Sequence, residues 1–293
     1  MYVRRMAEDI SDTSSKAAPG KDPFDGVRWD MTGAMSYGGY LQLDRLLDAQ
    51  RPLSGEHDEL LFIVIHQATE LWMKLGLHEL EAARERLAAD DLEPASKMLA
   101  RVARIQTQMI QAWEILSTMT PFDYSRFREA LGSSSGFQSF QYRQLEFLMG
   151  AKNARLIEVY AAEPRVHERL SVALHRPSLY DEALRLMARR GFAIPAGKVE
   201  RDWSLPYEAD AGVEAAWLEV YRNVDRHWDL YDLGEKLVDL EYRFQQWRFS
   251  HMKTVERIIG HKRGTGGSAG VAYLVKALEK GFFPELLSLR TSI

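Results

Sequence analysis

The sequence of 293 residues contains no cysteine. Disulfides, thiolate nucleophiles, cysteine-ligated zinc, iron–sulfur clusters and thiolate-ligated haem are therefore excluded. Any metal must be bound by His, Asp, Glu, Met or Tyr. A basic excess is also missing, since the formal net charge is −4. This balance argues against nucleic acid as a partner.

Long apolar runs are scarce as well. The longest, Leu60 to Ile65, is far too short to cross a bilayer, so we expect no membrane partner. The N-terminus has basic residues but no apolar segment typical of a secretory signal. We therefore expect a polar, mobile tail over residues 1–35 and a domain over 36–293, in a cytoplasmic protein.

Alternation typical of strands is nearly absent, and apolar residues recur at helical spacing instead. A Thr-Pro pair predicts the start of a short helix at 120–121 that ends at Gly132. The pattern predicts a single all-α domain, with further helices over about 40–50, 57–88, 94–117, 138–149, 154–161, 164–174, 178–190, 211–230, 231–259 and 269–280.

Residues 132–136, GSSSG, match the G-x-S-x-G pattern of a hydrolase nucleophile elbow. That motif requires a buried strand before the serine, whereas the preceding TPFDYSRFREAL reads as a capped helix. A turn between helices is the simpler interpretation. A loop whose small residues allow close approach to a ligand is a third.

Residues 264–269, GTGGSA, match the dinucleotide pattern G-x-G-x-x-A. The pattern again requires a preceding strand, and a long helix is expected there instead. What remains is a flexible loop before a helix, which suits an anionic group such as a carboxylate.

Two of the eight histidines differ from the rest. His66 ends the most apolar run, where it is either a core residue that bonds to Glu70 one turn later or a functional residue. His251 shares a helical face with Phe244, Trp247 and Val255, as haem ligation or plain core packing would require. The other six read as surface histidines.

Tyr124 and Arg128 form an i,i+4 pair before the serine loop. Arg128 is either a bidentate ligand for a carboxylate or a surface residue paired with Glu129 or Asp123. The residues alone favour the surface pairing.

Taken together, four stretches resemble the tryptophan 2,3-dioxygenase family of haem enzymes. They occur in family order from about residue 36 to the C-terminus: SYGGYLQLDRLLDAQRPLSGEHDELLFIVIHQATELW, FREALGSSSGFQSFQYRQLEFLMG, RFQQWRFSHMKTVERIIGHKRGTGGSAGV and FFPELLSLRTS. The match is long and specific, unlike either glycine pattern alone.

The resemblance implies an all-α homotetramer with one haem b per subunit, ferrous in the active state. It also implies cleavage of the indole C2–C3 bond of L-tryptophan by O2, giving N-formyl-L-kynurenine. His251 would bind the iron, and Trp113 and Gly136 would line the haem pocket. His66 would be the distal histidine that binds the indole N–H, with Phe62 packed against the indole ring.

The resemblance further assigns the amino-acid head of the substrate. Arg128 would bind the carboxylate beside Tyr124, and Thr265 would contact the carboxylate and ammonium groups. Ser135 would lie nearest the bound gas, which makes the serine loop part of a pocket. Tyr37 and Tyr40 match a segment that reaches a neighbouring subunit's site.

Three short segments depart from the family pattern, and Ala68 and Ser133 lie close in sequence to pocket residues. One alternative is therefore a relative in secondary metabolism that oxygenates a substituted tryptophan, with insertion of one oxygen atom or two. Another is a non-catalytic haem or gas-sensing protein. The second would leave Arg128 and Thr265 without a role.

Overall fold

The computed structural model describes residues 23–30 and 32–293. Most of the expected polar tail, residues 1–22 and 31, lies outside the described residues, so its mobility stays a prediction. The chain divides between Ala49 and Gln50 into a small N-terminal unit and a large one.

The N-terminal unit contains two short helices, α1 (Tyr37–Leu41) and α2 (Leu43–Leu47). The Ser36 hydroxyl caps α1 by accepting a hydrogen bond from the Gly39 N–H at 3.0 Å. Gln42 has a left-handed backbone, φ 54°, which separates the two helices. The single helix predicted from Tyr40 is therefore broken.

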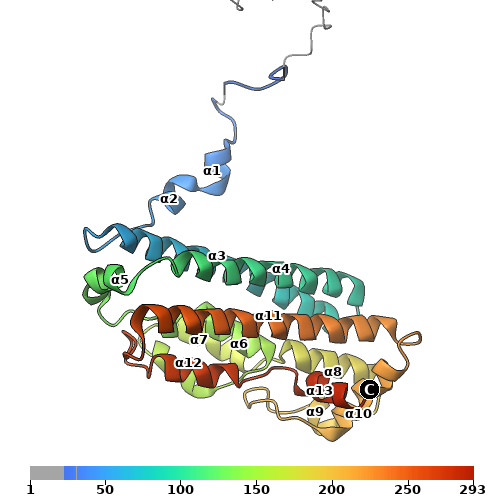
Figure 1. The fold of residues 1–293 in the computed structure, drawn as a ribbon. Helices are drawn as coiled ribbons and strands as arrows, with labels where there is room; N and C mark the ends of the chain where they lie inside the picture. Colours follow the sequence, from blue (N-terminus) through green and yellow to red (C-terminus); the bar gives the residue numbers. More distant parts are fainter. Residues whose placement is uncertain (1–22, 31) are drawn as a thin grey trace, which may run out of the picture. The chain divides into compact units, whose positions relative to one another are not determined.

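Three long helices build the core of the large unit: α3 (His57–Ala88), α4 (Leu92–Leu116) and α11 (Trp228–Ile259) (Figure 1). Helix α4 packs against both α3 and α11. Most of its buried residues recur at alternating spacings of three and four, which places them on one broad face that contacts both neighbours. Burying each large aliphatic side chain contributes about 1.5–3 kcal/mol.

Helix α3 is apolar beyond what this core requires. By length and composition it could cross a membrane, a test that core helices of soluble proteins also pass, and 28% of its most apolar window is buried. Leu60, Val64, Leu71, Trp72 and Leu75 remain exposed along it.

Shorter helices complete the large unit. No strand occurs among the described residues, so the all-α prediction is confirmed. These helices are α5 (Pro121–Phe127), α6 (Phe140–Met149), α7 (Pro164–Leu174), α8 (Leu179–Arg189), α9 (Ala196–Val199), α10 (Ala211–Arg222), α12 (Val271–Leu278) and α13 (Pro284–Ser288).

Several predicted boundaries were wrong. The helix expected over 154–161 is two 3₁₀ turns, Ala154–Leu156 and Glu158–Tyr160. Helix α10 ends at Arg222 and α11 begins at Trp228, so the break lies earlier than residue 230. Helices α9 and α13 were not predicted, because five or fewer residues carry too little periodicity.

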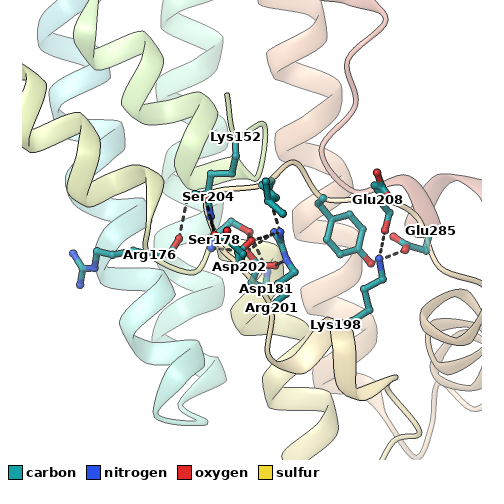
Figure 2. Close-up of polar contacts among 12 residues, drawn as sticks. Lys152, Arg176, Ser178, Asp181, Lys198, Arg201, Asp202, Ser204, Glu208 and Glu285 are labelled. Carbon is teal, nitrogen blue, oxygen red and sulfur yellow. Dashed lines mark hydrogen bonds and ion pairs between the residues drawn. The ribbon is translucent and has the colours of Figure 1, made fainter. Parts of the chain in front are cut away.

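Residues 190–210, which link α8 to α10 and contain α9, are held by a buried polar cluster that we call the Asp181 cluster: Lys152, Ser178, Asp181 and Arg201 (Figure 2). The Asp181 carboxylate is fully buried. It accepts hydrogen bonds from the Ser178 N–H at 2.8 Å and the Arg201 Nε at 3.0 Å. A charge removed from water in this way is stable because several donors surround it.

Lys152, another member of the cluster, caps the C-terminal end of α7. Its Nζ donates to the carbonyl oxygens of Ala173 at 2.7 Å and Arg176 at 2.8 Å, where α7 leaves carbonyls without helical partners. Burial lowers the pKa of Lys152 to about 7. Both hydrogen bonds of Lys152 go to backbone carbonyls, so we assign it a structural role despite the lowered pKa.

Candidate active site

A cavity of about 530 Å³ lies in the large unit. Helices α3, α4, α5, α6, α11 and α12 and both glycine-rich loops contribute to its lining. This volume is in the range of small-molecule and cofactor sites. His66 and His251 both line it, so the fold joins the two histidines that the sequence singled out.

His66 is held in one orientation by its own helix. Its Nδ1 lies 2.7 Å from the carbonyl oxygen of Phe62, one turn earlier. A carbonyl can only accept, so Nδ1 carries the proton and Nε2 is left as an acceptor. Burial lowers the pKa of His66, although the Phe62 carbonyl and Glu70 oppose this.

The expected hydrogen bond from His66 to Glu70 is wrong. The Glu70 carboxylate instead accepts a hydrogen bond from Gln141 Nε2 at 2.7 Å. The reason is the neighbouring Phe62 carbonyl, which already occupies the donor nitrogen of His66.

His251 projects from α11 and stacks on Trp113, with ring centroids 4.6 Å apart and 12° between the planes. In the described part of the chain, no hydrogen bond reaches either nitrogen of its ring. Burial, and then the nearby His66, lowers the pKa of His251 to about 4. The ring is therefore neutral at pH 7, which is the form that binds a metal.

Trp113 and Trp247 line the cavity beside His251. Both indole Nε1 atoms are buried and have no hydrogen-bond partner among the described residues. Trp113 also meets His66 edge-on, with centroids 6.4 Å apart. Unpaired buried donors are costly in a finished core, so their grouping beside His251 indicates a surface that a bound group covers.

An aromatic wall continues from His66. The Phe62 ring lies 4.1 Å from the His66 ring and 6.0 Å from the Tyr124 ring, centroid to centroid. Tyr124 lines the cavity, and burial raises its pKa. The wall therefore presents a neutral, flat surface suited to an aromatic ligand.

The first glycine loop follows α5 and a 3₁₀ turn, Arg128–Leu131, with no strand before it. The hydrolase interpretation of Ser134 is thereby excluded, since the elbow needs that strand. Gly132 turns the chain with φ 56°. Ser134, Ser135 and Gly136 then line the cavity, as a pocket loop requires.

The second glycine loop follows α11, so the dinucleotide interpretation also fails. The two loops touch closely. The Thr265 hydroxyl donates to the Ser134 carbonyl. A Cβ on Gly266 would lie 2.7 Å from that of Ser135, which explains why only glycine fits.

Arg128 lies beside this junction, and its Nη2 donates to the Arg263 carbonyl at 2.6 Å. The pairing with Glu129 or Asp123 is wrong. Asp123 instead closes the cap of α5 by accepting from the Thr120 N–H at 3.0 Å. Within the described ranges, Arg128 has no carboxylate partner.

Tyr37 and Tyr40 lie on α1 in the N-terminal unit, and their side chains are exposed. Their predicted role in a neighbouring site stays a prediction. Ala68 and Ser133, where the sequence departs from the family pattern, are not among the described residues that line the cavity.

Sequence reasoning missed several residues that line the cavity, including Thr69, Tyr142, Arg143, Arg248 and Tyr273. Helical spacing could have found two of them, since Thr69 and Arg248 lie three residues from the two histidines. The others come from α6 and α12, whose approach depends on tertiary packing.

A metal site made of protein side chains alone is not found, because no group of three or more His, Asp or Glu is so arranged among the residues described. A haem iron needs only one or two protein ligands, its other ligands being porphyrin nitrogens. The cavity, the unpaired His251 ring and the unpaired indole donors would fit a haem held by His251.

Comparisons with known proteins agree with this geometry. The family model described as tryptophan 2,3-dioxygenase matches residues 25–293. The chain is 61% identical over 268 residues to a tryptophan 2,3-dioxygenase of Cupriavidus necator, covering 92% of this chain and 91% of the relative. It is 57% identical to one of Bacillus thuringiensis, covering 92% and 96%. A tryptophan 2,3-dioxygenase 1 of Ralstonia nicotianae is 59% identical, covering 91% of each.

Proposed function

The chain belongs to the tryptophan 2,3-dioxygenase family, and we propose how its cavity carries out that family's reaction. The protein is an oxidoreductase that cleaves the indole C2–C3 bond of L-tryptophan with O2 and forms N-formyl-L-kynurenine. Identities of 57–61% over most of the chain support this activity over monooxygenation of a substituted tryptophan. The observation that carries the site assignment is the pair His66 and His251 on one cavity.

His251 would be the protein ligand of a haem b iron, because its neutral ring has no other partner in the described structure. Trp113 would support the ligand ring by stacking, and Gly136 would let the loop approach the macrocycle. When bound, ferrous haem supplies the O2 chemistry that no side chain provides.

His66 would orient the indole. Its Nδ1 is committed to the Phe62 carbonyl, so Nε2 is the acceptor for the indole N–H. Phe62 would pack on the indole ring from the same helix. Both residues lie on one turn of α3, and their relative geometry is thereby fixed before substrate binds.

The amino-acid head would be bound where the two glycine loops meet. Arg128 would bind the carboxylate, with Tyr124 beside it and Thr265 in contact with the carboxylate and ammonium groups. Arg128 and Thr265 now donate to backbone carbonyls of Arg263 and Ser134. Binding would exchange these neutral acceptors for a charged one, which forms stronger hydrogen bonds.

Ser135 would lie nearest the bound gas. Its hydroxyl already accepts a hydrogen bond from the Phe137 N–H at 3.3 Å, which fixes the serine rotamer at the cavity wall. The surrounding aromatic wall keeps bulk water from the reacting ring.

We further propose a homotetramer, in which Tyr37 and Tyr40 reach a neighbouring subunit's site. The exposed apolar residues of α3, from Leu60 to Leu75, support association with another copy, because large apolar surfaces commonly mark interfaces. A cytoplasmic protein without a membrane or nucleic-acid partner remains our expectation. Sedimentation of the purified protein tests the oligomeric state, and a monomer would contradict it.

The activity is tested by supplying ¹⁸O2 and L-tryptophan to the haem-reconstituted, reduced protein and measuring product mass. Incorporation of two labelled atoms is expected. Incorporation of one atom, or turnover of a substituted tryptophan alone, would instead favour the monooxygenase alternative. Haem binding without turnover of either substrate would favour a gas-sensing role.

A further inference from the structure

Arg248 is a buried arginine on α11, three residues before His251. Its side chain is 3% exposed. The guanidinium lies over the Phe244 ring at 4.7 Å and the Phe282 ring at 5.1 Å from each centroid. Burial of this depth makes the identity of its hydrogen-bond partners decisive.

Those partners lie on two other segments. Nε donates to the Tyr142 hydroxyl at 3.1 Å and Nη2 to the Glu146 carboxylate at 2.9 Å, both on α6. Nη1 donates to the carbonyls of Ala277 at 3.0 Å and Lys280 at 2.9 Å. Every guanidinium nitrogen is thus engaged by the protein itself, which indicates a structural anchor.

Ala277 lies in the last turn of α12, where helical carbonyls have no helical partners, and Lys280 directly follows the C-cap residue Glu279. Helix α12 is otherwise weakly held, because Val271 is its one buried residue. Tyr273, Leu274 and Ala277 of this helix line the cavity. The loop that carries Thr265 leads directly into its N-terminus.

Two further residues of α11 act at the same place. Gln245 Nε2 donates to the Lys280 carbonyl at 2.8 Å, and the Glu241 carboxylate accepts from the Phe283 N–H at 2.9 Å. Glu241, Gln245 and Arg248 follow one face of α11 at spacings of four and three. Arg248 is the member of this series that also reaches α6.

We propose that Arg248 is a positioning residue of the dioxygenase reaction. It fixes α12, and with it the cavity wall and the Thr265 loop, relative to the helix that carries His251. This inference rests on the proposed function, because Thr265 is taken to bind the substrate head. Lysine cannot replace arginine here, because its three donors share one nitrogen, which cannot lie within hydrogen-bond distance of all four acceptors as the three nitrogens of a guanidinium do.

The test compares two reconstituted holoenzyme variants, Arg248→Lys and Arg84→Lys. Arg84 is the matched control, because it is also buried and donates to a carbonyl, that of Pro177 at 3.3 Å, but it does not line the cavity. Thermal midpoint, haem absorption, kcat and KM for L-tryptophan are measured, with hydrogen exchange over residues 264–278. Kinetics are recorded well below both midpoints.

We expect Arg248→Lys to raise KM by roughly tenfold or more, because a displacement of about 1 Å is sufficient for such losses. Exchange over 264–278 should accelerate, while kcat falls less and haem absorption stays unchanged. Arg84→Lys should lower the midpoint only. If Arg248→Lys lowers the midpoint as Arg84→Lys does, with KM and exchange unchanged, the positioning role is wrong.

Two further outcomes keep the hypotheses separate. An inactive wild-type holoenzyme would overturn the proposed function, and the exchange comparison would still decide whether Arg248 anchors α12. If Arg248→Lys does not fold, Glu146→Gln replaces it, because this change leaves the guanidinium in place with a neutral acceptor. A smaller rise in KM with faster exchange would then support the anchor, and unchanged values of both would overturn it.

Discussion

The Asp181 cluster and the cavity are both buried polar regions of the large unit, but they differ in how fully their buried polar groups are hydrogen-bonded. In the Asp181 cluster, the carboxylate and the Lys152 ammonium each donate to or accept from several protein groups. At the cavity, the buried indole nitrogens of Trp113 and Trp247 have no hydrogen-bond partner among the described residues.

Perturbed ionisation does not separate the two regions. Burial lowers the pKa of Lys152 to about 7 and that of His251 to about 4. A search for shifted pKa values would therefore select both. Hydrogen-bond pairing does separate them: the polar groups of the Asp181 cluster are paired, whereas the two indole donors at the cavity are buried and unpaired.

The largest expected effect is at His251. His251→Ala should weaken haem binding by more than about 100-fold, since loss of a ligand exceeds the loss of its supporting contacts. Helix content should be retained, as the core of α11 is unaffected. Haem titration followed by absorption checks this, with the exposed His78→Ala as control. Equal haem affinity in both variants would refute the proposal that His251 binds the haem iron.

The matching test of the Asp181 cluster is Arg201→Ala. Removing the arginine leaves the buried Asp181 charge without its ion-pair partner, which should cost about 3 kcal/mol of unfolding free energy. The kcat of the folded enzyme should not change. Denaturant unfolding measures the loss, and Arg185→Ala, whose side chain is 34% exposed, serves as control. A lowered kcat would place function in the cluster.

Arg128→Ala tests the substrate side of the cavity. Loss of a charged hydrogen-bond donor to the carboxylate should raise KM roughly 100-fold, while haem absorption is retained. Arg126→Ala is the matched control two residues away, because Arg126 pairs with Glu56 at the surface. Unchanged tryptophan affinity in Arg128→Ala would remove the carboxylate assignment.

The smallest expected effect is that of Lys152→Met, which should lower the free energy of unfolding by about 2 kcal/mol, because the Ala173 carbonyl of α7 and the Arg176 carbonyl after it lose their donor. Between pH 7 and 10.5 the unfolded chain keeps the Lys152 proton that the folded protein releases. Wild-type stability therefore rises with pH relative to the variant across this window. Unfolding at several pH values measures it.

Much of the fold could be predicted from periodicity, because α3, α4 and α11 each bury one recurring face. The short α9 and α13 could not, since their formation depends on tertiary contacts. The Glu70 bond to His66 failed for a local reason: a backbone carbonyl one turn earlier satisfies the ring first. Neighbours on a helix are predictable, but competition between acceptors is visible only in three dimensions.

The candidate site residues likewise divide into those that the sequence could predict and those that it could not. His66 and His251 stood out as histidines on apolar faces, yet core packing explained them equally well until the structure placed both on one cavity. Arg128 was ambiguous because its acceptor, the Arg263 carbonyl, is a backbone atom far along the sequence. Arg143 and Tyr273 gave no signal, because only the approach of α6 and α12 brings them to the wall.

The continuity of α3 has a consequence for how genes of this family can change in length. One helix of 32 residues places His66 at the cavity and, about five turns later, Arg84 against the Pro177 carbonyl. Inserting or deleting one codon between them would rotate everything beyond it by about 100°. Insertions and deletions that survive selection should therefore accumulate in the connections between helices, while α3 keeps its residue count.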